Sequence, residues 1–153
     1  MPEASEWTVL TAKKQTKGRG KPGSLWFSPE GGLYFSLILK PRKNPEDLAP
    51  FTLMAAEAIV SVIKRECYLT ADIKLPNDIL IDSKKVCGIL TEKVKDALIV
   101  GIGLNLNIKE FTEELNATSL LLECKKNLDL KYFLFEIIDE LKKKYLNLLH
   151  NRL

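Results

Sequence analysis

The amino-acid sequence predicts an α+β domain in which helices pack on one face of a mixed, largely antiparallel sheet. Short β-prone segments separated by turns occupy the start and the middle of the chain. Two longer segments, one before the middle strands and one at the end, repeat apolar residues at helical spacing. Since each helical segment has one apolar stripe to bury, the elements fit a single layered domain with its own core.

Two strands are predicted in the first forty residues. Residues 7–13 contain the β-prone run Thr-Val-Leu. Residues 32–40 are almost entirely apolar or aromatic, which is typical of a strand inside a sheet, and Pro41 ends it. The segment between the two strands is rich in glycine and basic residues, and it is therefore predicted to be a loop.

Two helices follow from capping signals and apolar stripes. The first is predicted from Asn44, an N-cap with Pro45 in the first turn, to about Glu66. The second is predicted to begin after Asp129, which caps it. Their apolar stripes are Leu48, Phe51, Ala55, Ala58, Ile59, Val62 and Ile63 in the first helix, and Leu130, Phe133, Leu134, Ile137, Ile138, Leu141, Tyr145 and Leu148 in the second.

The region between the two helices is predicted to be mainly β. Strands are expected at 71–74, 79–82, 86–92 and 97–108, with a short helix within 113–122. The Ser-Lys-Lys run at 83–85 and the charged run at 93–96 are typical of hairpin turns. These strands should pair with their sequence neighbours and extend the sheet.

Composition limits the function. The chain has 153 residues, 46% of them hydrophobic and 28% charged, which predicts one packed domain over residues 1–153. A net charge of +3 is too small to indicate specific DNA or a membrane surface as a partner. The three separated cysteines, Cys67, Cys87 and Cys124, indicate reduced thiols. With no apolar run of membrane-spanning length and no leader pattern, we expect a cytoplasmic protein.

The loop at residues 15–26 is the first candidate site. Its sequence is Gln-Thr-Lys-Gly-Arg-Gly-Lys-Pro-Gly-Ser-Leu-Trp. Glycines let backbone N–H groups converge on an anion, and Lys17, Arg19 and Lys21 add positive charge there. The loop therefore suits a phosphate or carboxylate, although its spacing fits neither a Walker loop nor a dinucleotide fingerprint. The same pattern is also typical of a solvated loop or a basic arm for nucleic acid.

Three further blocks give this loop a context. They are Lys-Leu-Pro-Asn-Asp at 74–78, Lys-Val-Cys-Gly-Ile-Leu at 85–90 and Gly-Ile-Gly-Leu-Asn-Leu-Asn at 101–107. In this order, from about Thr8 to the final helix, the chain resembles the catalytic domain of biotin protein ligases, in the biotin/lipoate ligase superfamily. The resemblance implies that fold, and it implies ATP-dependent activation of biotin to biotinyl-5′-adenylate with Mg²⁺. The acyl group would then pass to a lysine of a biotin carboxyl carrier protein.

The resemblance also implies roles for individual residues. Lys85 and Arg19 would be catalytic, because a fixed cation neutralises charge as the biotin carboxylate attacks the α-phosphorus. The implied substrate-binding residues are Gln15, Gly18, Arg19, Gly20, Lys21, Trp26, Lys85, Gly88 and Leu90. The implied nucleotide-binding residues are Trp26, Asn77, Asp78, Asn105 and Asn107, and Asp78 is also the candidate metal ligand.

Several of these residues also have a structural interpretation. Lys85 follows a predicted turn and, without the resemblance, would be read as a solvent-exposed lysine. Trp26 either anchors the loop by burial or stacks on the adenine. The chain departs from the family at Lys21 and Ser24, where arginine is usual, and at Leu75, where tryptophan is usual. Lysine keeps the charge but loses the bidentate fork, so a weaker grip on phosphate is expected at Lys21.

The polar residues of the two later blocks have alternatives of the same kind. Asn77 and Asp78 follow Pro76, and such residues commonly hydrogen-bond the turn at a strand break. Asn105 and Asn107 alternate with apolar residues, which is typical of a strand with one solvent-facing side. For these four residues, the ligand-binding role is an implication of the resemblance.

The resemblance leaves part of the family unmatched. We expect one catalytic-like domain without the usual upstream segment of the biotin pocket and without the small carboxy-terminal β-barrel. Besides the carrier protein, a homodimer is left open. Three other functions remain: a lipoate–protein ligase, a non-catalytic remnant that binds biotin or its adenylate, and a basic RNA-binding module that uses residues 13–21.

Overall fold

Six strands form one sheet in the order β1-β2-β6-β5-β4-β3 in the computed structural model, which describes residues 3–151. The strands are β1 (Val9–Ala12), β2 (Leu33–Leu39), β3 (Asp72–Lys74), β4 (Asp78–Ile81), β5 (Lys84–Val94) and β6 (Ala97–Leu104). All five neighbouring pairs are antiparallel, and an isolated bridge between Lys85 and Ala117 is parallel. The α+β prediction is therefore confirmed.

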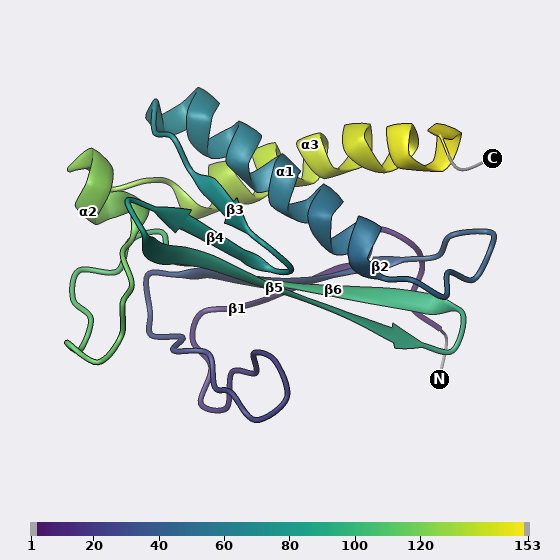
Figure 1. Ribbon diagram of the computed structural model, residues 1–153, viewed down its shortest axis with the longest axis horizontal. Coiled ribbons are helices and arrows are strands. Elements are labelled where there is room, and N and C mark those ends of the chain that lie inside the picture. Colours follow the sequence, from purple (N-terminus) through teal and green to yellow (C-terminus); the bar gives the residue numbers. More distant parts are fainter. Residues whose placement is uncertain (1–2, 152–153) are drawn as a thin grey trace.

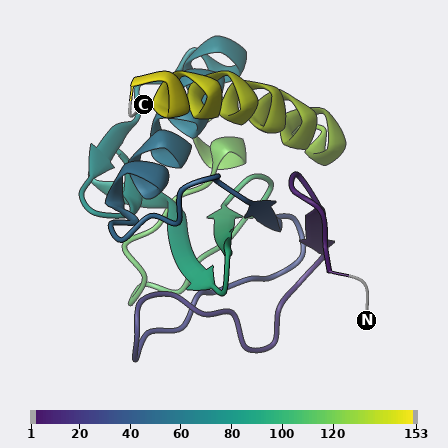
Figure 2. The same ribbon diagram turned by 90° about the vertical axis from the view of Figure 1, so that its right-hand side faces the viewer.

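The two long helices lie on one side of this sheet (Figures 1 and 2). Helix α1 (Ala49–Cys67) packs on the strands, and α3 (Leu130–Asn151) packs along α1, with the short α2 (Leu120–Cys124) before it. In β6 every second residue is buried, so Leu98, Val100, Ile102 and Leu104 join the core. The intervening residues of β6 face the other side, where the long loop between β1 and β2 lies (Figure 1).

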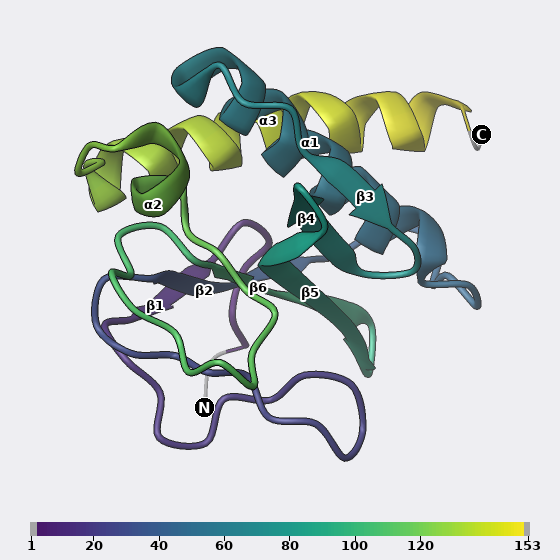
Figure 3. The same cartoon turned by 60° about the vertical axis from the view of Figure 1, so that its left-hand side comes forward.

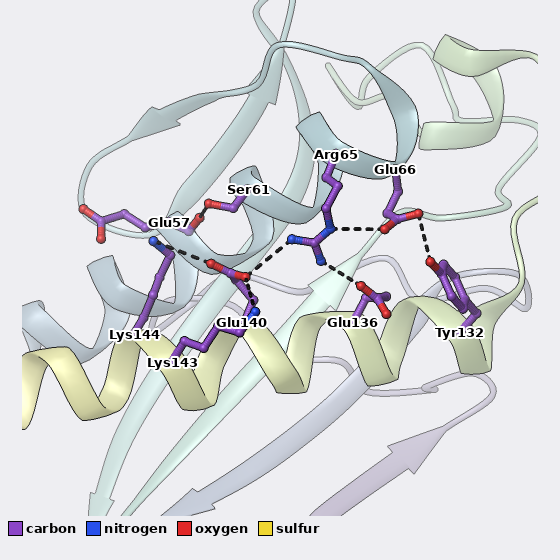
Figure 4. Close-up of polar contacts among 9 residues, drawn as sticks. All are labelled: Glu57, Ser61, Arg65, Glu66, Tyr132, Glu136, Glu140, Lys143 and Lys144. Atoms are coloured by element: carbon purple, nitrogen blue, oxygen red, sulfur yellow. Dashed lines mark hydrogen bonds and ion pairs between the residues drawn. The ribbon is translucent and has the colours of Figure 1, made fainter.

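Polar contacts fix α3 against α1 (Figure 4). The guanidinium of Arg65 on α1 donates to Glu136 at 2.8 Å and to Glu140 at 3.5 Å, both on α3. It also pairs with Glu66 at 3.2 Å, and Glu66 accepts a hydrogen bond from the Tyr132 hydroxyl at 3.1 Å. One arginine therefore contacts three carboxylates at the seam between the helices.

Replacing Arg65 with methionine should lower the free energy of unfolding by about 1 kcal/mol, because Glu66 and Glu136 then lose their cation. Urea unfolding measures this change. It should shrink in about 1 M salt, which screens charges beyond roughly 3 Å. The matched control is Lys143→Met, which removes one exposed contact to Glu140 at 3.9 Å. An equal loss in that control would contradict the network.

The start predicted for the first helix is wrong by four residues. Helix α1 begins at Ala49 rather than after Asn44, with Leu48 at the N-cap position and Pro50 in the first turn. The Asp47 carboxylate accepts the Ala49 N–H at 3.0 Å. A proline in the first turn is the correct signal, but the sequence offers it at two places. The predicted end is correct to one residue.

The hairpin between β4 and β5 is tighter than predicted. Asp82 and Ser83 both have positive φ, 46° and 65°, and they form a two-residue turn. Lys85 is therefore the second residue of β5 and not part of the turn. Strand β6 ends at Leu104, so Asn105 and Asn107 lie beyond the strand on which they were predicted.

Three further predictions concern the cap of the last helix, the state of the cysteines and membrane-spanning helices. The Asp129 carboxylate accepts the Tyr132 N–H at 2.8 Å, as expected of the cap of α3. All three cysteines are free, and burial raises the pKa of the Cys67 thiol to about 11. In the described part of the chain, no helix combines the length and the apolar character needed to cross a membrane.

Candidate functional site

A cavity of about 490 Å³ lies on the face of the sheet opposite the helices, beneath the loop between β1 and β2. Figure 3 shows this loop and the segment after β6 on the same side of the sheet. Strand pairing aligns the residues of the cavity floor in rows across the sheet. One row is Ala12, Tyr34, Gly103, Gly88 and Asp78, and the next is Leu10, Ser36, Gly101 and Leu90. Glycines at the centre of both rows let a side chain or a ligand approach the backbone closely.

The glycine loop is closed at its base by hydrogen bonds. Gln15 N–H donates to the Ser28 carbonyl at 3.0 Å, and Trp26 N–H donates to the Gly18 carbonyl at 2.8 Å. The buried Ser28 hydroxyl, which reaches Gln15 Oε1 at 2.9 Å and the Trp26 carbonyl at 3.0 Å, joins the two. The loop is therefore a folded element over the cavity. Ser28 was not predicted, although a serine within the aromatic run Trp-Phe-Ser could have indicated it.

Trp26 packs on the glycines of the floor. A Cβ on Gly103 would lie 2.3 Å from the indole Nε1, and a Cβ on Gly88 would lie 3.1 Å from its Cζ3. The Lys85 ammonium stands 5.0 Å from the centre of a Trp26 ring, within the range of a cation–π contact. The structure thus seats the tryptophan inside the site, between the loop and the sheet.

Lys85 pairs with Asp78 in the same corner of the cavity. The Lys85 Nζ is 2.8 Å from Asp78 Oδ1, and the Asp78 side chain is 17% exposed. A two-residue turn brings Lys85 onto β5, opposite β4, which carries Asp78. A partly buried cation and carboxylate thus stand beside the glycine floor.

Unpartnered polar atoms gather at this place. Within residues 3–151, four buried side-chain atoms accept or donate no hydrogen bond: Trp26 Nε1, Asn77 Oδ1, Asp78 Oδ1 and Asn105 Oδ1. Asp78 Oδ1 has its ionic contact to Lys85 but no hydrogen bond of good geometry. Leaving such a group unpaired costs about 1–3 kcal/mol. Trp26, Asn77 and Asp78 line the larger cavity and Asn105 borders a smaller one beside it, which indicates that a ligand supplies the missing bonds.

A smaller cavity of about 150 Å³ lies on the other side of Trp26. Its walls are mainly apolar and aromatic, and the Phe27 and Phe111 rings meet edge to face at 6.2 Å. Asn105, 2% exposed, borders this cavity and donates its amide to the Thr118 carbonyl at 3.1 Å. Trp26 and Lys85 line both cavities and so form the wall between them.

The structure brings most of the predicted site residues together. The larger cavity is lined by Gln15, Arg19, Gly20, Lys21, Trp26, Asn77, Asp78, Lys85, Gly88 and Leu90. Gly18 is buried at the base of the loop, and Asn105 borders the smaller cavity. Asn107 lies elsewhere, because its amide donates to the Leu128 carbonyl at 2.7 Å and accepts the Leu128 N–H at 2.9 Å. The structure therefore gives Asn107 a role in holding the segment before α3.

Glu92 is a lining residue that was not predicted. It pairs with Arg19 across the loop, with contacts of 3.1 and 3.3 Å. The alternation Gly88, Leu90, Glu92 along one predicted strand is a signal that would have placed Glu92 on the cavity face.

Two other groups of the site region remain uncharged at neutral pH. Burial raises the pKa of the Tyr34 phenol, whose hydroxyl donates to the Pro29 carbonyl at 2.7 Å. Burial also raises the pKa of the Cys87 thiol, which lies in the core rather than in the cavity. Neither group is therefore an activated nucleophile.

Comparison with known proteins agrees with the geometry. Residues 2–108 match the model of the biotin/lipoate A/B protein ligase family. The bifunctional ligase/repressor BirA of Bacillus subtilis is 44% identical over 127 residues, which cover 76% of this chain and 39% of BirA. The biotin–[acetyl-CoA-carboxylase] ligase of Paracoccus denitrificans is 36% identical over 109 residues, covering 67% of this chain and 45% of that enzyme.

Solved structures show the same relationship. The biotin protein ligase of Aquifex aeolicus, in complex with biotin and ATP, superposes with a TM-score of 0.87 at 38% identity. The match covers 93% of this chain and 62% of that protein. This chain thus spans less than half of the two sequence relatives and less than two thirds of the structural one. By the family model, the relatives and the fold, the chain belongs to the biotin/lipoate A/B protein ligase family.

Proposed function

We propose that this domain joins biotin to ATP as biotinyl-5′-adenylate and then passes the acyl group to a lysine of a biotin carboxyl carrier protein. The observation that carries the proposal is the position of Lys85. It stands in the wall between a glycine-floored cavity and an aromatic cavity, where the two halves of an acyl adenylate would meet. The names of the relatives, several of which are biotin ligases, support biotin as the acid.

The two cavities divide the substrate between them. The glycine floor under the loop suits the acyl chain and ring of biotin, because Gly101 leaves the backbone accessible and Trp26, packed on Gly88 and Gly103, adds an apolar wall. The smaller cavity suits adenine, since aromatic walls offer stacking surfaces. There the free Asn105 Oδ1 can accept a hydrogen bond from the exocyclic amino group.

In the first step, a carboxylate oxygen of biotin forms a bond to the α-phosphorus of ATP, and the bond from that phosphorus to the β-phosphate bridging oxygen breaks. Pyrophosphate leaves with the electron pair. The Lys85 ammonium is placed to neutralise the negative charge that develops between carboxylate and phosphate. Such electrostatic stabilisation of the transition state is the main contribution of a protein to this chemistry. Arg19 and Lys21 on the loop supply further positive charge.

In the second step, the amine of the carrier lysine attacks the acyl carbon, and the bond from that carbon to the AMP oxygen breaks. The amine loses a proton, and AMP leaves. The carrier supplies the nucleophile, so the domain contributes position and charge and needs no covalent intermediate of its own.

Asn77 and Asp78 are the residues that fit a magnesium ion. Asn77 Oδ1 is buried without a hydrogen bond, Asp78 Oδ1 has only its ionic contact to Lys85, and hard oxygen donors of this kind suit Mg²⁺. One carboxylate and one amide fit an ion that substrate phosphates hold in part. When bound, the ion would neutralise phosphate charge.

Pyrophosphate release tests the proposal. With ATP present, release should depend on added biotin, and equal concentrations of lipoate should give little. A lipoate-dependent signal would instead indicate a lipoate ligase. Binding of a non-hydrolysable biotinyl-adenylate analogue without pyrophosphate release would indicate a non-catalytic binding domain. If neither acid promotes release and the analogue does not bind, the proposed function is wrong.

A further inference from the structure

Two of the three cations proposed to act on the phosphate, Lys85 and Arg19, are each paired with a carboxylate of the protein. Lys85 pairs with Asp78 at 2.8 Å. Arg19 uses both terminal nitrogens of its guanidinium, with Nη1 and Nη2 donating to the two oxygens of Glu92 at 3.3 and 3.1 Å. This is the bidentate arrangement that an arginine also makes with phosphate. Glu92 thus occupies one bidentate face of Arg19 that a ligand anion could use.

The two pairs lie at different ends of the cavity. A Cβ on Gly88 would lie 3.4 Å from Lys85 Cε, so the lysine reaches the row of Gly88. Glu92 is four residues further along β5, opposite Ile99 and close to the turn into β6. At the rise of an antiparallel strand, four residues span about 13 Å. Because the backbone positions of Gly88 and Glu92 are this far apart, a phosphate bound at Lys85 with contacts of roughly 2.7–2.9 Å would draw Arg19 away from Glu92.

We propose that Glu92 is a positioning residue that holds Arg19 away from Lys85 in the ligand-free protein. This inference rests on the proposed function, in which Arg19 and Lys85 contact the same phosphate. Binding of the adenylate then exchanges the Glu92 carboxylate for the ligand phosphate on Arg19. Arg19 moves toward Lys85 as the glycine loop closes. Glu92 sets the fraction of protein molecules in which Arg19 is free to bind the ligand. It takes no part in the chemical steps.

The size of the effect follows from exposure. The Arg19 and Glu92 side chains are 71% and 40% exposed, so water and salt screen their attraction. If only a fraction of the protein has Arg19 free to bind the ligand, the apparent affinity is the intrinsic affinity multiplied by that fraction. An exposed pair of this kind corresponds to about a two- to fivefold reduction in apparent affinity.

Calorimetric titration of the whole chain tests this inference, with a non-hydrolysable biotinyl-adenylate analogue as the probe. Glu92→Gln keeps the shape and removes the charge, and it should bind the analogue about two- to fivefold more tightly than the parent. In the pyrophosphate assay, the change should fall on KM for ATP rather than on kcat. The gain should shrink as salt rises, because the parent pair is screened.

Two controls separate this role from a general charge effect. Asp96→Asn removes an exposed charge at the same end of the sheet and should leave affinity for the analogue unchanged. In an Arg19→Gln background, adding Glu92→Gln should have no further effect. Equal or weaker binding by Glu92→Gln, an equal gain from Asp96→Asn, or a gain that persists without Arg19 would each overturn the inference. If the analogue binds neither parent nor variant, the proposed function fails and this inference with it.

Discussion

Lys85→Ala should slow biotin-dependent pyrophosphate release by about 10²- to 10³-fold, the usual loss when one preorganised charge-stabilising group is removed. The reason is the position of Lys85 in the wall between the two cavities, 5.0 Å from the centre of a Trp26 ring. Single-turnover measurement of pyrophosphate release with saturating ATP and biotin reports the chemical step. The matched control is Lys84→Ala, an exposed lysine one residue earlier on β5, which should keep parental activity.

The same substitution also affects stability. Without Lys85, the Asp78 carboxylate loses its partner at 2.8 Å while remaining largely buried. Unfolding free energy should therefore fall by about 1–3 kcal/mol. Combining Lys85→Gln with Asp78→Asn removes both charges and should recover most of that stability without recovering activity. Activity that returns together with stability, or an active Lys85→Ala protein, would remove Lys85 from the catalytic step.

Local sequence patterns predicted the elements well, because capping, apolar stripes and strand runs depend on neighbouring residues. They failed where two local signals competed. Pro45 and Pro50 both suit a first helical turn, and the structure uses the second. The two-residue turn at Asp82 and Ser83 places both in a left-handed conformation, which sequence favours for glycine, asparagine and aspartate but not for serine. Lys85 was therefore predicted in the turn, but the structure places it on strand β5.

The site was predicted from the order of its blocks, whereas its internal contacts depend on segments far apart in the chain. The pairing of Arg19 with Glu92 joins residues 73 positions apart, and no local pattern indicates it. Asn107, in contrast, was predicted to bind the nucleotide and does not line either cavity. It resembles a ligand residue in sequence, but its amide is used by Leu128 in a segment whose position depends on the whole fold. The cytoplasmic location and the homodimer stay predictions.

The two glycines of the Gly-Arg-Gly run should differ sharply when each is replaced by alanine. A Cβ on Gly18 would lie 2.5 Å from the Trp26 carbonyl and 2.6 Å from the Ser28 hydroxyl, both within the hydrogen-bonded base of the loop. A Cβ on Gly20 would lie 2.6 Å from the Ser24 hydroxyl, with the next atom at 3.7 Å. That exposed hydroxyl can rotate away by exchanging its hydrogen bond to the Lys21 carbonyl for water, whereas the backbone carbonyl of Trp26 cannot move without opening the loop.

Gly18→Ala should therefore cost about 1–3 kcal/mol of overpacking, which the protein relieves by opening the base of the loop. If the loop must close on the adenylate, most of that cost appears as weaker binding, about 5- to 150-fold for the non-hydrolysable biotinyl-adenylate analogue. Gly20→Ala should change affinity by less than about threefold, because its clash is with a rotatable hydroxyl. Limited proteolysis gives an independent readout: bound analogue should protect residues 17–25 in Gly20→Ala but not in Gly18→Ala. Equal affinities and equal protection in the two variants would show that the closed base of the loop is not required for ligand binding.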